Sequence, residues 1–188
     1  MRILVLDNYD SFTYNLVYII RQLGYGEQMD IYRNDKISLD EVSKYNKILL
    51  SPGPGIPEEA GIMPELLKRY ASEKDILGIC LGHQAIGEAF GGSLTNLSEV
   101  VHGLASEVSV DSDVLFEGLP DSFKIGRYHS WVINEKTLSP DLEVTARTPD
   151  GQIMGVRHKK YKVRGLQFHP ESVLTEHGVD MMRNWLEG

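Results

Sequence analysis

A single cysteine, Cys80, stands where the chain turns from an apolar run into a helical pattern, within Gly78-Ile-Cys-Leu-Gly82. A small residue two positions before and two after a nucleophile is the pattern of a nucleophile elbow. Larger side chains at Gly78 and Gly82 would collide with the neighbouring strand and helix, which accounts for the glycines. The turn also places the sulfur at a helix N-terminus, where the dipole and free amides favour a thiolate. The Leu81 amide would face the same space and could donate a hydrogen bond to an oxyanion.

Two other roles remain open for Cys80 on this pattern alone. The glycines could serve close packing only, with the thiol buried as a small apolar side chain, as is common for a free cysteine. A metal site is a third possibility because Cys80 and His83 are three residues apart, but no second ligand pair stands at matching spacing. The elbow pattern favours the nucleophile and leaves the inert thiol as its main alternative.

A thiol nucleophile needs a group that accepts and later delivers a proton, and histidine suits both tasks near neutral pH. Of the six histidines, His169 has the setting of a base, since an apolar strand pattern runs into His169-Pro170-Glu171. In locally extended backbone, residues two apart project to the same side, so Glu171 could orient the imidazole. An isolated pair of this kind could also be a surface pair ending a strand. The presence of Cys80 makes a Cys-His-Glu triad possible.

The first half of the chain alternates short apolar runs with helical patterns. Asp10 and Ser11 could cap the first helix, and Gly24 could end it. Strands are expected at 2–7, 29–33, 47–50 and 75–79, and helices at 12–23, about 39–45, 64–71 and 83–90. The third strand runs into Ser51-Pro-Gly-Pro-Gly55, a loop that neither a helix nor a strand could absorb.

The second half consists mostly of strand and turn patterns from about 106 to 168, with a hairpin signal at Asp150-Gly151 and a last helix at about 178–186. Alternating strands and helices imply parallel strands joined by right-handed crossovers. The predicted fold is therefore α/β: a three-layer, flavodoxin-like sandwich with a mostly parallel central sheet, plus a smaller antiparallel β region in the C-terminal half. A length of 188 residues fits one domain spanning 1–188.

Composition narrows the classes of partner. The formal net charge of −8 disfavours nucleic acid and anionic membranes, and a small molecule or a protein is the better expectation. No apolar run approaches a membrane span, and the start turns polar too early for a signal peptide. A single cysteine forms no internal disulfide and fits a reducing compartment, so a soluble, cytoplasmic protein is expected.

Four separated segments together resemble the class-I (triad) glutamine amidotransferases. They are Ser51–Gly55, Gly78-Ile-Cys-Leu-Gly-His-Gln84, His129-Ser130 and Gly165-Leu-Gln-Phe-His-Pro-Glu-Ser172. Within that family, three more segments resemble the small subunits of anthranilate synthase and 4-amino-4-deoxychorismate synthase: Leu6-Asp-Asn-Tyr-Asp-Ser-Phe-Thr13, Val101-His-Gly103 and Leu174-Thr-Glu-His-Gly178. The resemblance spans almost the whole chain.

The resemblance implies roles that spacing alone does not assign. Cys80 would attack the carboxamide carbon of L-glutamine, His169 would move the protons, and Glu171 would hold His169. The amides of Gly53 and Leu81 would form the oxyanion hole, with Gly53 flanked by the rigid Pro52 and Pro54. The α-amino and α-carboxylate groups of glutamine would be held by Gln84, Ser130 and Trp131, partly through backbone atoms. No cofactor or metal is expected on this chain.

The resemblance also implies a partner, a chorismate-using synthase subunit that consumes the ammonia, with any Mg²⁺ bound there. The segment Asn8–Thr13 would lie at the same rim as Cys80 and is a candidate contact surface. Leu104 and Trp131 depart from the family pattern, which has lysine and leucine more often at these places. Two alternatives remain: the glutaminase subunit of another synthetase, such as GMP synthetase, and a redox-sensing elbow-cysteine protein without hydrolytic turnover.

Overall fold

Five short strands form the parallel half of the sheet in the computed structural model, which describes residues 1–188. Their order across the sheet is β2 (Met29–Arg33), β1 (Ile3–Asp7), β3 (Lys47–Leu50), β4 (Asp75–Ile79) and β9 (Val163–Leu166). The strand segments β1 and β3 are buried along their whole length, as expected for a parallel sheet covered on both faces. The parallel pairing of β4 with β9 matters most, because it places the segments that follow these two strands at the same edge.

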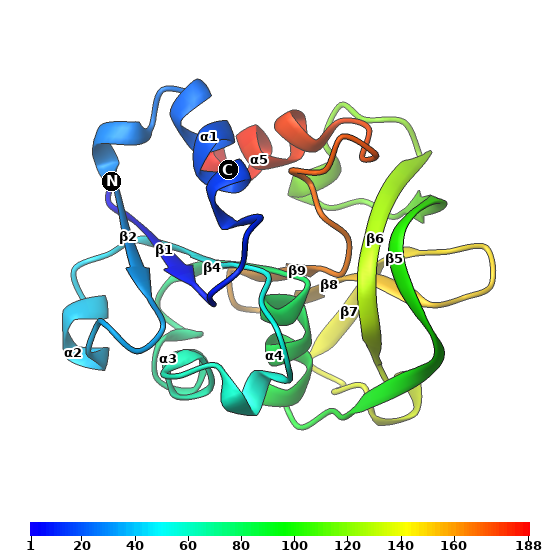
Figure 1. The fold of residues 1–188 in the computed structure, drawn as a ribbon, viewed down its shortest axis with the longest axis horizontal. Coiled ribbons are helices and arrows are strands. Elements are labelled where there is room, and N and C mark those ends of the chain that lie inside the picture. Colours follow the sequence, from blue (N-terminus) through cyan, green and yellow to red (C-terminus); the bar gives the residue numbers. More distant parts are fainter.

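Helices cover both faces of this parallel half (Figure 1). The helices α1 (Thr13–Gln22) and α5 (Gly178–Glu187) pack into one apolar core, and α2 (Leu39–Val42), α3 (Met63–Tyr70) and α4 (Leu81–Ala89) pack into the other. Short 3₁₀ turns complete the helical elements: η1 (Gly26–Gln28), η2 (Pro57–Glu59), η3 (Val114–Phe116) and η4 (Glu135–Thr137). No helix in the chain has both the length and the apolar character needed to cross a membrane.

The remaining strands continue the same sheet in antiparallel fashion, in the order β9, β8 (Ile153–His158), β7 (Leu142–Arg147), β5 (Leu94–Val110) and β6 (Ser122–Ile133). Figure 1 shows β5 and β6 as a long pair at one end of the molecule. The α/β class is confirmed, but the layout differs from the expectation of a mostly parallel sheet with a separate, smaller antiparallel region. The sheet is mixed and continuous because β9 pairs with β4 on one side and with β8 on the other.

The bounds of the first four strands follow the sequence prediction closely, whereas β5 begins at Leu94, before the strand region expected from about 106, and helix ends shift by a few residues. The hairpin signal at Asp150-Gly151 is confirmed, since β7 and β8 are antiparallel neighbours joined across it. The predicted capping of the first helix is wrong. The N-cap of α1 is Phe12, whose side chain has no acceptor for a capping hydrogen bond. The Asp10 carboxylate instead accepts from the Phe12 amide, one residue before the helix (Oδ2 to N, 2.9 Å). The helix α2 ends at Val42, earlier than expected.

A buried ion pair ties the C-terminal helix to the sheet. The Lys47 ammonium donates to Asp75 Oδ2 (2.7 Å) and to the Trp185 carbonyl (2.8 Å), and the Trp185 indole donates to Asp75 Oδ1 (2.9 Å). Both charged side chains are about nine-tenths buried, at 9% and 10% exposure. Each charge therefore depends on the other, because an unpaired charge at this depth is costly.

Candidate active site

Cys80 lies in the tight turn between β4 and α4 and has an unusual backbone conformation. Its φ is 52° and its ψ is −99°, a positive φ that side-chain-bearing residues rarely adopt. Its amide donates to the Leu166 carbonyl of β9 at 2.8 Å, and its carbonyl accepts the Gln84 amide at 3.0 Å, so the residue is held from both sides. Such strained residues occur at functional sites, where the surrounding structure enforces them.

The two glycines of the elbow are required by close approach, as the sequence predicted. A Cβ on Gly78 would lie 2.5 Å from the carbonyl carbon and oxygen of Gly82 and 2.8 Å from the His83 amide of the helix. A Cβ on Gly82 would lie 2.6 Å from the Leu50 carbonyl oxygen of β3. These contacts are with backbone atoms, which cannot swing aside, so the steric explanation of Gly78 and Gly82 is confirmed.

His169 and Glu171 are paired after the end of β9. The His169 Nδ1 atom lies 2.5 Å from Glu171 Oε1, and the two side chains are almost fully buried, at 3% and 0% exposure. The prediction that extended backbone would bring them together is wrong. The Ser172 amide donates to the His169 carbonyl at 3.1 Å, so the chain turns here and the turn places the carboxylate beside the ring. This burial rules out the alternative of a surface pair.

The environment of His169 keeps its ring protonated. Burial lowers its pKa, but the interactions with Cys80 and then with Glu171 outweigh burial and raise the pKa to about 10. Two aromatic rings wall off the imidazole: the centroid of Tyr128 lies 5.0 Å away and that of Phe12 lies 5.7 Å away, both edge-on. The Nε2 atom is buried and has no hydrogen-bond partner, so it is available to the thiol and its reaction.

A pocket of about 300 Å³ opens at Cys80 between the elbow and the β5–β6 pair. Five of the residues expected at the site line it: Gly53, Cys80, Gln84, Ser130 and Trp131. The other lining residues are Gly55, Val100, Val101, His102, Tyr128 and His129. The volume is at the small end of the range for ligand pockets and suits a compound of amino-acid size.

The remaining expected residues adjoin the pocket without lining it. Pro52 and Pro54 flank Gly53 in the loop after β3, and Pro54 and Leu81 line a neighbouring cavity beside Asn8. This geometry is compatible with the expected use of the Gly53 and Leu81 amides.

Gln84 and the backbone of Trp131 are joined across the pocket wall. The Gln84 Nε2 atom donates to the Trp131 carbonyl at 3.0 Å. The same carbonyl lies 3.0 Å from His129 Nδ1, while the Arg127 guanidinium donates to His129 Nε2 at 3.1 Å. Burial, followed by the Arg127 charge, lowers the pKa of His129 to about 4, so this ring is neutral. The large side chain of Trp131 leaves this backbone contact intact, as expected for a departure of side chain only.

Sequence reasoning gave no role to several residues that complete the site. The rings of Phe12 and Tyr128 pack against His169. Arg127 and His129 are hydrogen-bonded to each other, and His129 contacts the Trp131 carbonyl in the pocket wall. Gln167 contacts the sulfur of Cys80. In its segment, residues 165–172, the sequence had indicated roles only for His169 and Glu171. The residues without a predicted role act through contacts between distant segments, which spacing along the chain does not reveal.

His83, the other half of the metal alternative, is buried in α4. Burial, followed by the nearby His129, lowers its pKa to about 3. It packs so closely on β9 that a Cβ on Gly165 would lie 2.7 Å from its Nδ1. No group of three or more His, Cys, Asp or Glu side chains is arranged to hold a metal ion.

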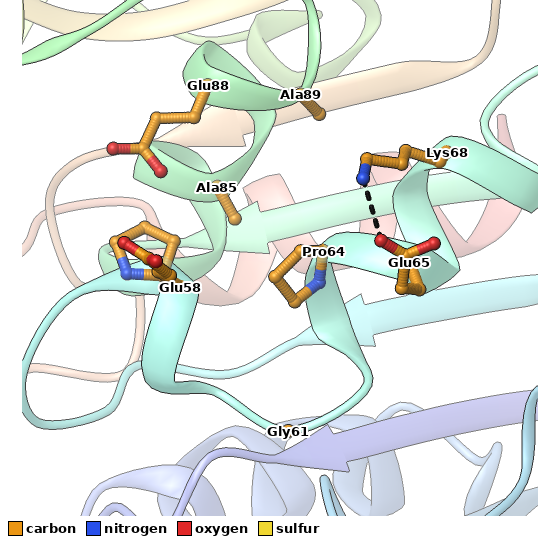
Figure 2. A pocket seen from close by; sticks show the side chains of 9 residues that line it. Glu58, Gly61, Pro64, Glu65, Lys68, Ala85, Glu88 and Ala89 are labelled. Carbon is orange, nitrogen blue, oxygen red and sulfur yellow. Dashed lines mark hydrogen bonds and ion pairs between the residues drawn. The ribbon is translucent and has the colours of Figure 1, made fainter.

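A larger pocket, of about 430 Å³, lies on the other side of α4, between that helix and α3 (Figure 2). Glu58 and Glu88 face it, and Lys68 is engaged by Glu65 at 2.7 Å. Burial, followed by the charge of Glu58, raises the pKa of Glu88. The pocket contains no nucleophile and no histidine, so the chemistry of the chain lies at the smaller pocket beside Cys80.

Comparison with known proteins agrees with this geometry. The family profile for "Glutamine amidotransferase class-I" matches residues 4–188. The chain is 43% identical over 187 residues to the aminodeoxychorismate/anthranilate synthase component 2 of Bacillus subtilis, covering 98% of this chain and 95% of that protein. It is also 43% identical to the bifunctional protein TrpGD of Thermotoga maritima over 187 residues, covering 98% of this chain but only 32% of that longer protein. A crystal structure from Thermoplasma acidophilum, of a protein proposed to be part of a GMP synthase, superposes with a TM-score of 0.88 at 30% identity, covering 100% of this chain and 92% of that one.

Proposed function

Since the chain belongs to the class-I glutamine amidotransferase family, we propose that it hydrolyses L-glutamine through a Cys80 thioester and delivers the ammonia to a synthase subunit. The observation that carries the proposal is the buried His169–Glu171 pair beside a cysteine in a strained elbow. A redox-sensing cysteine can also gain reactivity from a nearby cation, but it needs no proton donor for a departing nitrogen and no adjoining pocket of amino-acid size. The pair and the pocket together favour acyl transfer.

The first half of the reaction begins with an imidazolium beside a sulfur at a helix N-terminus, which favours the thiolate. The sulfur attacks the carboxamide carbon, forming a C–S bond and moving an electron pair onto the amide oxygen. As the intermediate collapses, His169 gives its proton to the departing nitrogen, which leaves as ammonia. The products of this half are a γ-glutamyl thioester and a neutral His169.

The second half returns the enzyme to its starting state. Neutral His169 takes a proton from water, whose oxygen attacks the thioester carbon. Glutamate is released when the C–S bond breaks and the sulfur leaves as a thiolate beside the restored imidazolium. Glu171 stays bonded to Nδ1 throughout, which keeps Nε2 directed at the sulfur in both halves.

The amides of Gly53 and Leu81 are the proposed donors to the oxyanion. Leu81 begins α4 directly after the nucleophile, and Gly53 lines the pocket next to Cys80. Backbone donors are fixed before the reaction starts, so they stabilise the developing charge without reorganisation.

Gln84, Ser130 and Trp131 are the proposed contacts to the glutamine backbone. Both hydrogen bonds of Gln84 use its Nε2, which leaves Oε1 as an acceptor suited to an α-ammonium group. Ser130 adds a hydroxyl to the same wall. In this proposal the parallel strands form a flavodoxin-like three-layer sandwich that carries the triad, and the antiparallel strands supply the wall that holds the substrate.

The proposed partner is a chorismate-using synthase subunit, making anthranilate or aminodeoxychorismate. The component 2 relative from Bacillus subtilis is 43% identical, against 30% for the GMP synthase-like structure, so the chorismate assignment is favoured. We treat residues 1–188 as one glutaminase domain that acts in the cytoplasm, where its thiol stays reduced. Exposed Tyr9, within the candidate contact segment Asn8–Thr13, and Leu104, at 51% exposure, could take part in docking.

The test is a glutamine hydrolysis assay of the chain with and without its co-purified partner, alongside Cys80→Ser. We expect the variant to lose glutamine-dependent product formation and to keep the ammonia-dependent reaction of the partner, which bypasses the triad. Glutaminase activity that survives Cys80→Ser would refute the thioester. Recovery of a purine-handling synthetase in place of a chorismate enzyme would refute the partner and leave the chemistry standing.

A further inference from the structure

The side chain of Gln167 contacts the nucleophile directly and is not used by the mechanism above. It lies just after β9, two residues before His169, and is completely buried. Its Nε2 atom lies 3.6 Å from the Cys80 sulfur, within the range of an N–H···S hydrogen bond. Its Oε1 atom lies 3.3 Å from Gln84 Nε2.

The orientation of the Gln167 amide is fixed by a chain of groups that starts at a backbone carbonyl. The Trp131 carbonyl can only accept, so Gln84 must present its NH₂ group there, at 3.0 Å. The same NH₂ group faces Gln167, which must therefore present its oxygen to Gln84. Its own NH₂ group is then left to point at the sulfur of Cys80. The reverse orientation would bring two NH₂ groups together and would place an amide oxygen against a thiolate.

The far end of this chain is also fixed in direction. A guanidinium only donates, so the Arg127 bond at 3.1 Å makes His129 Nε2 an acceptor. The His129 proton is then on Nδ1 and is donated to the Trp131 carbonyl at 3.0 Å. Each hydrogen bond from Arg127 to the sulfur thus has one donor and one acceptor, with the Trp131 carbonyl accepting from both His129 and Gln84. All these groups are buried or half-buried.

We propose that Gln167 is a further catalytic residue of the glutaminase reaction, donating a hydrogen bond to the Cys80 sulfur. The bond favours the thiolate over the thioester, because a thioester sulfur is a weak acceptor. It therefore assists the step in which sulfur leaves as glutamate is released, and it holds the sulfur toward the pocket before attack. The inference rests on the proposed function, since it assigns a role within the same thioester chemistry.

Two substitutions separate this role from a merely structural one. Gln167→Glu has the same shape and still accepts from Gln84, but as a carboxylate it cannot donate to sulfur. Gln167→Met has nearly the same volume and removes both bonds. Gln22→Glu makes the same chemical change on an exposed position of α1 and serves as the control.

Glutaminase kcat and KM are measured at pH 7.5 in the complex with the synthase partner, together with the alkylation rate of the only thiol by iodoacetamide. We expect both Gln167 variants to lose about ten- to a hundred-fold in kcat, the rate equivalent of one hydrogen bond to a charged group, with KM changed less than about threefold. Alkylation should slow in both, and ammonia-dependent synthesis should be unchanged, showing that the complex is intact. The Gln22→Glu control should match the unmodified enzyme.

Full kcat in Gln167→Glu with loss only in Gln167→Met would overturn the proposal, because the residue would then serve only as an acceptor for Gln84. A rise in KM at unchanged kcat would also overturn it, placing the effect on substrate binding. The Cys80→Ser result distinguishes a failure of the Gln167 proposal from a failure of the proposed thioester mechanism. If Cys80→Ser is inactive and Gln167→Glu is fully active, only the role of Gln167 is lost.

Discussion

Gly53→Ala is the sharpest test of the proposed oxyanion hole, because the clash can be read from the structure. An added Cβ would lie 2.6 Å from Asn8 Cβ, 2.7 Å from the Asn8 carbonyl oxygen and 2.9 Å from Leu81 Cδ2, where ordinary contact begins at 3.4 Å. Asn8 cannot give way, since Ser51 holds its amide and its side chain at 2.8 Å each and Asn34 holds its Oδ1 at 3.0 Å. The loop that carries Gly53 must therefore shift, which moves the Gly53 amide away from its place in the pocket beside Cys80.

The expected cost of that movement is the loss of one oxyanion donor, about 10²- to 10³-fold in turnover or ~2.7–4 kcal/mol of transition-state stabilisation. The thiolate itself should be unaffected, because Gly53→Ala leaves Cys80, His169 and Glu171 unchanged. The assay is glutaminase kcat in the synthase complex, with iodoacetamide alkylation reporting the thiol and ammonia-dependent synthesis reporting the assembly. A large fall in kcat with normal alkylation is the expected signature.

Gly26→Ala is the matched control, since a Cβ there meets chiefly the flexible Arg21 side chain, with its Cγ at 3.0 Å. We expect it to leave kcat unchanged. If Gly53→Ala kept kcat within about threefold of the unmodified enzyme, the Gly53 amide would not be a donor to the oxyanion. The close approach at Gly53 would then matter for packing and not for catalysis.

Three further outcomes follow from the contacts described above. His169→Asn should lower glutaminase turnover by at least about 10²-fold, the usual contribution of a general acid–base, and an unchanged rate would mean that another group moves the proton. The lowered pKa of His83, about 3 against a usual 6.5, means that the unfolded chain binds a proton that the folded chain does not. The stability that comes from a neutral His83 should therefore be fully present above pH 6.5 and should fall as the pH drops towards 3, giving a lower urea midpoint at pH 5 than at pH 7. If a His83→Gln variant showed the same pH dependence, His83 would not be the cause. Lys47→Met should destabilise the fold by about 3 kcal/mol in chemical denaturation, because it leaves the Asp75 carboxylate buried without its cation, while glutaminase kcat stays unchanged; a loss below about 1 kcal/mol would mean that water replaces the ammonium.

The sequence predicted those parts of the fold that depend on local pattern. Strands β2, β3 and β4 have their predicted bounds because short apolar runs end sharply at polar or turn-forming residues. The start of β5 at Leu94 was missed, since residues such as Val100 remain exposed and the strand is defined by pairing with β6 and not by burial. A strand that is exposed and paired with a single neighbour over most of its length carries little periodicity, and the long hairpin also contains register shifts.

The residues of the candidate site could likewise be predicted only where their role depends on local pattern. The elbow glycines Gly78 and Gly82 could be predicted because their constraint comes from the turn itself. The proximity of Cys80 to His169 followed only if β4 and β9 were neighbours, which the sequence does not encode in any local pattern. Gln167 could not be assigned at all, because its orientation is set by residues on α4 and β6.

Three buried histidines lie around the elbow, and the groups that contact each ring give the three rings different pKa values. His83 meets backbone and apolar groups, so burial lowers its pKa to about 3, while Arg127 beside His129 adds to burial and lowers that pKa to about 4. Only His169 has a carboxylate at one nitrogen and the thiol at the other, and its pKa is raised to about 10. The two neutral rings therefore serve packing and hydrogen bonding, and the site holds a single mobile proton. Because this single proton lies beside the sulfur that attacks glutamine, it is in place to be given to the departing nitrogen and to be restored from water.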